Sequence, residues 1–120
     1  MIRHARKQAE RSTFRQRLGA VITKGDRVLS SACNELRYNR NVPQKFPESL
    51  HAEAAAVAKL LKDQRLHDLA GSTIYVCRIN RAGTSRLAWP CLECYNLLKA
   101  VGVRKIVYTT SNGSTATEGV

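Results

Sequence analysis

Two short motifs constrain this chain more than any other feature of its sequence. The first is His-Ala-Glu at 51–53, and the second is Pro-Cys-Leu-Glu-Cys at 90–94. A catalytic zinc ion typically keeps three protein ligands and leaves its fourth position to water, and imidazole and thiolate are both good zinc donors. His51, Cys91 and Cys94 supply that set of ligands. The fold must therefore bring the two motifs together if they serve one metal.

The cysteine motif is expected at the start of a helix. Residues 91–101 have a helical pattern, and Pro90 suits a helix start. Residues three apart share a helix face, so Cys91 and Cys94 can reach the same metal. The positive end of the helix dipole is expected to lower the pKa of these thiols and to favour the thiolate, which is the form that binds metal.

The histidine motif is expected at the start of another helix. Ser49 suits a helix cap and 54–61 is a strong helix-forming run, which places the start near His51. Positions two apart do not face the same way on a regular helix. His51 and Glu53 can therefore serve one site only if it lies beyond the N-terminal end of the helix. A metal held between two helix N-termini meets this condition.

Each motif also has other interpretations. His-Ala-Glu at a helix start can be a polar cap whose carboxylate suits the helix dipole. A C-x-x-C pair can be a thioredoxin-like redox pair or half of a structural zinc site. The redox interpretation is weakened because no proline follows the cysteine motif, where a thioredoxin-like fold needs its cis-proline loop. A structural site would need a fourth ligand from Cys33 or Cys77, and both lie in apolar strand-like runs where a free cysteine is usually buried.

The order, the proline and the spacing of the two motifs match the H-x-E…P-C-x-x-C signature of zinc nucleobase deaminases. The chain resembles the cytidine deaminase-like superfamily over nearly its whole length. The resemblance implies an α/β, three-layer α/β/α fold with a mixed sheet of four to five strands. It also implies Zn²⁺ as cofactor, with His51, Cys91 and Cys94 as ligands and Glu53 as the proton shuttle. The residues expected to contact the substrate are Asn34, Ala52, Trp89 and Pro90.

Such a site predicts a hydrolytic reaction. Zinc lowers the pKa of a bound water to roughly 7, and a nearby glutamate can pass the proton to the ring nitrogen and the leaving amine. The net reaction replaces an aromatic amine by a carbonyl and releases ammonia. The expected substrate is cytosine in a (deoxy)cytidine nucleotide. Two alternatives stay open: editing of cytosine or adenine in single-stranded DNA or RNA, and a non-catalytic zinc or nucleic-acid-binding module.

The rest of the pattern predicts a single domain at 1–110, followed by a short hairpin strand or a polar tail at 111–120. The expected elements are a basic helix at 2–13, hairpin strands at 18–23 and 27–33, a long loop at 34–49, and parallel strands at 72–79 and 105–109. Asn112-Gly113 is typical of a type I′ turn, which favours the hairpin strand. The segment 78–86 is expected to roof the pocket, and the ring of Trp89 can stack on a base or lie in a core or an interface.

Charge predicts the kind of partner. The 120 residues include 20 basic and 9 acidic ones, a formal net charge of +11, which favours an anionic partner such as a nucleotide or single-stranded DNA or RNA. No run is long enough for a membrane span, and the N-terminus lacks the apolar stretch of a secretory signal, so no membrane partner is expected. The four cysteines suit metal and core better than disulfides, which predicts a cytoplasmic protein. The sequence leaves open whether the chain forms a homo-oligomer.

Overall fold

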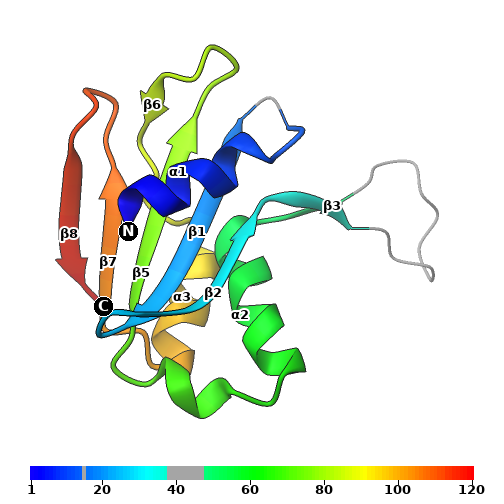
Figure 1. Cartoon of the computed structure of the whole chain (residues 1–120), viewed down its shortest axis with the longest axis vertical. Coiled ribbons are helices and arrows are strands. Elements are labelled where there is room, and N and C mark those ends of the chain that lie inside the picture. Colours follow the sequence, from blue (N-terminus) through cyan, green and yellow to red (C-terminus); the bar gives the residue numbers. More distant parts are fainter. Residues whose placement is uncertain (15, 38–47) are drawn as a thin grey trace.

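A computed structural model describes residues 1–14, 16–37 and 48–120 of the chain (Figure 1). The helices are α1 (Ile2–Glu10), α2 (Ala52–Lys62) and α3 (Leu92–Val101), with a short 3₁₀ helix, η1 (Leu66–Leu69), after α2. The strands are β1 (Arg17–Lys24), β2 (Arg27–Cys33), β3 (Glu35–Arg37), β4 (Glu48–Leu50), β5 (Thr73–Ile79), β6 (Ser85–Arg86), β7 (Lys105–Thr109) and β8 (Thr115–Gly119).

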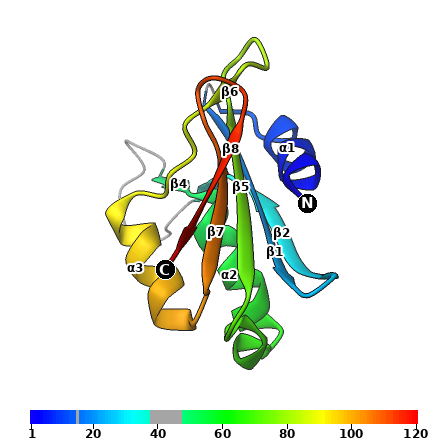
Figure 2. The same ribbon diagram turned by 90° about the vertical axis from the view of Figure 1, so that its left-hand side faces the viewer.

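The main sheet is mixed and lies between two helical layers. Its strand order is β2-β1-β5-β7-β8, and the two-residue β6 pairs with β5. β5 and β7 are parallel, as predicted, and the other neighbours in this sheet are antiparallel. α1 lies on one face, while α2 and α3 lie on the other (Figures 1 and 2). The predicted three-layer α/β/α fold is therefore confirmed, with β6 in addition to the predicted strands.

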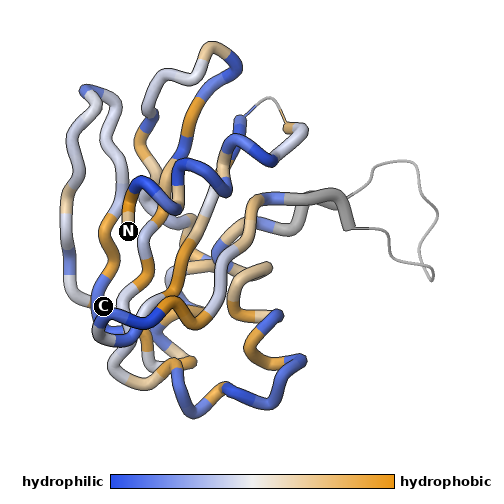
Figure 3. The backbone as a smooth tube through the Cα atoms, viewed as in Figure 1, coloured by the Kyte–Doolittle hydropathy of each residue, from blue (hydrophilic) through white to orange (hydrophobic). Residues whose placement is uncertain are grey.

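The sheet separates two hydrophobic clusters. The larger one lies between the sheet and the α2–α3 layer and includes the fully buried Ile22, Ile74 and Leu98. The smaller one lies under α1, where Ala5 and Ala9 face the sheet. Figure 3 shows hydrophobic segments along the central strands and a mostly hydrophilic α1. The central strands are buried on both faces, so they form a rigid surface on which α2 and α3 pack.

None of the helices in the described ranges combines the length and the apolar character that crossing a membrane requires.

Two predicted elements differ in extent from those observed. α1 ends at Glu10 rather than near residue 13, because Ser12 accepts a hydrogen bond from the Phe14 N–H and donates one to the carbonyl of Asn34, which holds the chain in a non-helical path. The loop predicted at 34–49 begins with β3 and ends with β4, which pair as an antiparallel ribbon. These strands are too short to show the alternation that predicts a strand. The remainder of that loop, including Pro43 and Pro47, lies outside the described residues.

The C-terminal hairpin strand is present as β8, but its turn is not the predicted type I′. A type I′ turn needs positive φ at both central residues, and in this turn only Gly113 has it, at 86°. The loop instead spans 111–113, with Thr110 N donating to Ser114 O at 2.9 Å and Gly113 N donating to Thr110 O at 3.3 Å. The side chain of Asn112 accepts a hydrogen bond from the Ser114 N–H at 3.2 Å, which favours this three-residue loop.

Gly19 allows α1 to lie directly on β1. A Cβ atom at this position would overlap the carbonyl oxygen of Ala5 and the backbone nitrogen of Ala9. These are backbone atoms, so relief would require moving the whole helix. We expect Gly19→Ala to lower the free energy of unfolding by about 3 kcal/mol, measured by denaturant titration. Gly119→Ala is the matched control, because nothing lies within 4 Å of its added Cβ. Equal stability of the two variants would contradict this account of the α1 contact.

Candidate active site

His51 and Cys91 are the N-cap residues of α2 and α3. Both have extended backbone angles, with φ and ψ of −63° and 149° at His51 and −64° and 166° at Cys91. Their carbonyls accept the first helical hydrogen bonds, from Ala55 N at 2.9 Å and Tyr95 N at 2.8 Å. The predicted helix starts are therefore confirmed. The extended cap conformation turns each side chain away from its own helix and into the space beyond the N-terminus.

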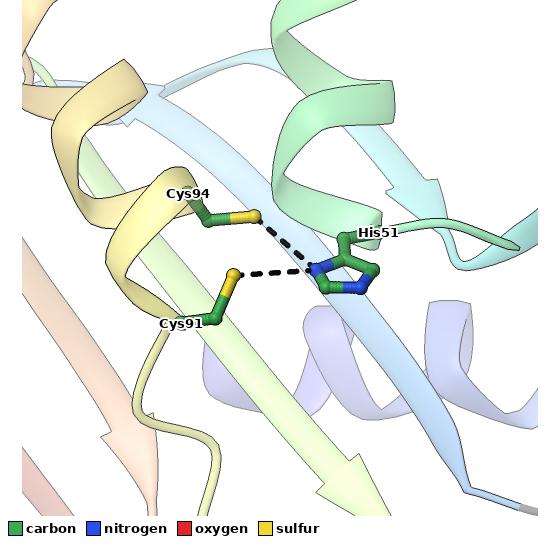
Figure 4. A group of neighbouring side chains, drawn as sticks. All are labelled: His51, Cys91 and Cys94. Atoms are coloured by element: carbon green, nitrogen blue, oxygen red, sulfur yellow. Dashed lines mark hydrogen bonds between the residues drawn. The ribbon is translucent and has the colours of Figure 1, made fainter.

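The three expected ligands converge on one point (Figure 4). His51 Nδ1 lies 3.6 Å from Cys91 Sγ and 3.4 Å from Cys94 Sγ, and the three donor atoms are all within 4.8 Å of one another. Zinc–nitrogen and zinc–sulfur bonds in a tetrahedral site imply a nitrogen–sulfur separation of about 3.6 Å. The donor set and its spacing therefore fit Zn²⁺.

The cluster does not extend to the other cysteines. Within the described ranges, neither Cys33 nor Cys77 joins the three donors. Cys77 is buried in the cluster under α1, on the other side of the sheet, as expected of a small core residue. Three protein ligands leave a fourth position open, which is the arrangement of a catalytic rather than a structural zinc site.

The environment of Cys94 differs from the one expected from the helix dipole. Burial raises the pKa of the Cys94 thiol, and the neighbouring carboxylate of Glu53 raises it further. The sequence predicted that the positive helix end lowers the pKa of this thiol. In the structure the helix end does not by itself hold Cys94 as a thiolate. A coordinated metal ion would do so, since metal binding deprotonates a thiol outright.

Glu53 is a buried carboxylate beside the three donors. Its side chain is only 3% exposed, and in the described part of the chain Oε1 has no hydrogen-bond partner. Burial raises the pKa of Glu53, against the lowering effects of its own backbone N–H and of His51. A buried oxygen without a partner is costly, and such groups concentrate at sites that bind a ligand or carry a proton.

Glu53 and two of the three expected ligands, His51 and Cys91, share a pocket of about 130 Å³. The residues that line it are Leu18, His51, Glu53, Arg78, Leu87, Ala88, Trp89 and Cys91. Trp89 is 37% exposed, and its ring lies 5.7 Å from that of Tyr95 and 5.1 Å from that of Tyr108. Two aromatic neighbours hold the indole in place while part of it remains open to the pocket. The pocket thus combines an aromatic surface with the metal donors and a carboxylate.

Sequence reasoning missed part of this lining. Leu18 and Leu87 were not among the expected site residues, and no local motif marks them. Arg78 belongs to the segment expected to roof the pocket, and it does line the pocket, although the sequence did not single it out. Leu18 and Arg78 reach the site because β1 and β5 are neighbours in the sheet, and Leu87 directly follows β6, which pairs with β5.

The other residues expected to contact the substrate, Ala52, Pro90 and Asn34, are buried and do not line this pocket. Ala52 and Pro90 are buried and flank the ligands His51 and Cys91 in the chain, but they do not line the pocket. Asn34 is buried, and its amide bridges the chain: Oδ1 accepts from the Leu18 N–H, and Nδ2 donates to the carbonyl of Gln16, each at 3.0 Å. A contact of any of these residues with the substrate stays a prediction.

Asn34 allows a test that separates a structural contribution from a substrate contact. We expect Asn34→Ala to lower the free energy of unfolding by about 2 kcal/mol, because it leaves the Leu18 N–H and the Gln16 carbonyl without their partner. Denaturant titration measures this loss, and KM for substrates that differ only in the sugar measures a sugar contact. Unchanged stability combined with a raised KM would contradict the bridging arrangement and would mean that the amide serves the substrate alone.

The three-layer fold and the zinc site define a zinc-dependent hydrolytic enzyme. The family model for the cytidine and deoxycytidylate deaminase zinc-binding region matches residues 1–110, so the chain belongs to that family. It is therefore a zinc-dependent deaminase. A comparison with curated proteins gives no match.

Solved structures share this fold. The dCMP deaminase of cyanophage S-TIM5, in complex with dCMP and dUMP, is similar with a TM-score of 0.68 and 23% identity, over 89% of this chain and 76% of that one. The cytidine deaminase of Burkholderia pseudomallei is similar with a TM-score of 0.69 and 18% identity, over 98% of this chain and 88% of that one. The cytidine deaminase of Mycobacterium leprae is similar with a TM-score of 0.60 and 18% identity, over 98% of this chain and 89% of that one. At these identities the similarity concerns the fold.

Proposed function

We propose that this deaminase converts cytosine to uracil in a (deoxy)cytidine nucleotide. The observation that carries the proposal is the buried carboxylate of Glu53, which has no partner on Oε1 within the described residues and lines the same pocket as His51 and Cys91. A structural zinc site has no need of such a group. Support for cytosine also comes from the similar folds, which are those of enzymes named for dCMP and cytidine.

The reaction consumes one water molecule and releases ammonia. Zinc held by the three donors would supply a water of lowered pKa as the nucleophile. Glu53 would carry two protons in turn, the first from the attacking water to the ring nitrogen and the second from the new hydroxyl on the ring carbon to the leaving amine. Its raised pKa suits a group that must hold the proton between these steps. The bond from the ring carbon to the amine breaks as the carbonyl forms.

Trp89 orients the base. Its ring is held by Tyr95 and Tyr108 and remains partly exposed at the pocket. A base that stacks on a fixed indole gains contact without ordering another side chain. In this proposal one face of the pyrimidine lies against Trp89 and its reactive edge points to Glu53, and the support is that both residues line the same small cavity.

A polynucleotide substrate is the second proposal, and the exposed face of α1 favours it. Arg3 and Lys7 of α1 and Arg11, the residue that follows the helix, are exposed, in a chain with a formal net charge of +11. Such a surface attracts the phosphates of single-stranded DNA or RNA, with an affinity that falls steeply as salt rises. None of the four cysteines, all within the described ranges, forms a disulfide, which suits the cytoplasmic location that we propose.

A substrate panel separates these proposals. The zinc-loaded protein is incubated with dCMP, CMP, deoxycytidine, cytidine, adenosine and oligonucleotides containing cytosine or adenine, and the release of ammonia and the product mass are measured. Turnover of cytosine nucleotides alone supports the first proposal. Turnover confined to oligonucleotides replaces it by the second. No product from any compound, with zinc bound, would contradict both.

A further inference from the structure

A second cavity, with a volume of about 330 Å³, is lined by cationic side chains. Its lining residues are Gln16, Asn80, Arg81, Ala82 and Arg86, and we call it the basic hollow. Arg81 and Arg86 are exposed, and within 1–14, 16–37 and 48–120 no ion pair joins either guanidinium to a carboxylate. Two guanidinium groups beside one hollow create a region of positive potential that favours an anionic ligand.

The basic hollow and the active-site pocket share a wall. Arg78 lines the pocket, and its Nε donates a hydrogen bond at 3.3 Å to Oε1 of Gln16, which lines the hollow. On the other side, Arg86 pairs with Arg78 across the β5–β6 ladder, and the next residue, Leu87, lines the pocket. A substrate whose base occupies the pocket can therefore extend a charged group into the hollow.

The loop that carries Arg81 is fixed by hydrogen bonds. Asn80 N donates to Thr84 O at 3.0 Å, and Asn80 Oδ1 accepts from Thr84 N at 2.9 Å. Gly83 provides the left-handed turn, with φ of 84°, and its carbonyl accepts a hydrogen bond from Arg6 of α1 at 2.7 Å. A loop held from within and from a neighbouring helix loses little conformational entropy when it binds a ligand.

We propose that the basic hollow is a phosphate-binding subsite for the substrate, with Arg81 and Arg86 as the donors. The inference rests on the proposed function, because it takes the base to occupy the adjoining pocket. Guanidinium groups form charge-assisted and often bidentate hydrogen bonds with phosphate oxygens. The phosphate can belong to the nucleotide that is deaminated or to its neighbour in a single strand. The chemistry that the hollow recognises is the same.

Binding measurements on zinc-loaded Glu53→Gln protein test the subsite without turnover. Trp89 is the one tryptophan of the chain and lies at the pocket, so its fluorescence reports binding, with equilibrium dialysis as a second measure. The ligands are deoxycytidine, dCMP and a short oligonucleotide with one cytosine. We expect Arg81→Gln and Arg86→Gln each to weaken binding of a phosphate-bearing ligand about tenfold. The affinity for deoxycytidine, which has no phosphate, should change by less than about twofold.

Arg104→Gln is the matched control, since it removes the same charge from an exposed residue outside both cavities. If the Arg81→Gln and Arg86→Gln variants lose affinity for dCMP, the subsite binds the nucleotide's own phosphate. If they lose affinity only for the oligonucleotide, the subsite binds a neighbouring phosphate. Unchanged affinity for every ligand in both arginine variants, or an equal loss in Arg104→Gln, overturns the subsite while leaving the proposed function intact. Absence of binding of all three ligands to the parent protein, together with an inactive wild type, overturns both.

Discussion

Replacing Glu53 by glutamine is expected to slow deamination by about a thousandfold, since a positioned general acid–base group contributes roughly 10²–10⁴-fold. Glu53 supplies the one carboxylate among the residues that line the pocket, and its Oε1 is buried. Glutamine keeps the size of the side chain but cannot carry a proton from water to the base. The measurement is kcat for release of ammonia from the preferred cytosine substrate.

The Glu53→Gln variant should keep its zinc and its stability. Glu53 is not one of the three donors, and an uncharged amide avoids the cost of burying a carboxylate. Glu93→Gln is the matched control, because Glu93 lies between the two cysteine ligands yet is exposed, and it should keep nearly normal turnover. Loss of zinc from Glu53→Gln, or activity within about tenfold of the wild type, would contradict the assignment of Glu53 as the proton carrier.

Cys94→Ser is expected to abolish both zinc binding and turnover. Cys94 Sγ lies 3.4 Å from His51 Nδ1 and is the buried member of the donor set. A neutral serine hydroxyl replaces a thiolate ligand and leaves two strong donors, too few for a stable site. The loss should also appear in stability, because a ligand that binds only the native state stabilises it by about 3 kcal/mol at a hundredfold excess over its Kd.

The stability effect can be separated from damage to the core. Chelation should lower the Tm of the wild type, while the Tm of Cys94→Ser should be the same with and without added zinc. Cys33→Ser provides the control, since Cys33 lies outside the donor cluster and its variant should bind zinc normally. Zinc content is measured by atomic absorption after dialysis. A Cys94→Ser protein that retains stoichiometric zinc would show that the metal sits elsewhere.

The sequence predicted the metal site because the constraint there is local. Three donor residues placed at two helix starts need only the helices to meet, and the N-cap conformations of His51 and Cys91 supply the direction of their side chains. The three-layer arrangement was implied by the resemblance to the cytidine deaminase-like superfamily, whereas the order of helical and strand patterns predicted only that two strands run parallel. The parallel pairing of β5 and β7 is what a strand-helix-strand unit requires.

Features that depend on tertiary packing were not predictable in this way. Leu18 and Leu87 line the pocket because of how β1 and β6 pair with β5, and neither has a signal in its local sequence. The pKa of Cys94 rises because the thiol is buried and because the carboxylate of Glu53 lies near it, and both depend on how the two helices pack. The bridge that Asn34 makes between Gln16 and Leu18 likewise appears only once the strands are assembled.

Zinc titration of the protein with dCMP as substrate tests the central claim most directly. The protein is freed of metal by chelation, Zn²⁺ is added in steps, and dUMP and ammonia are measured at each step. The account predicts that turnover is absent without zinc, rises in proportion to added Zn²⁺ and levels off at one ion per chain. Turnover that is unaffected by chelation, or a protein with one bound Zn²⁺ that deaminates neither dCMP nor CMP, would contradict the proposed zinc-dependent deamination of a cytosine nucleotide.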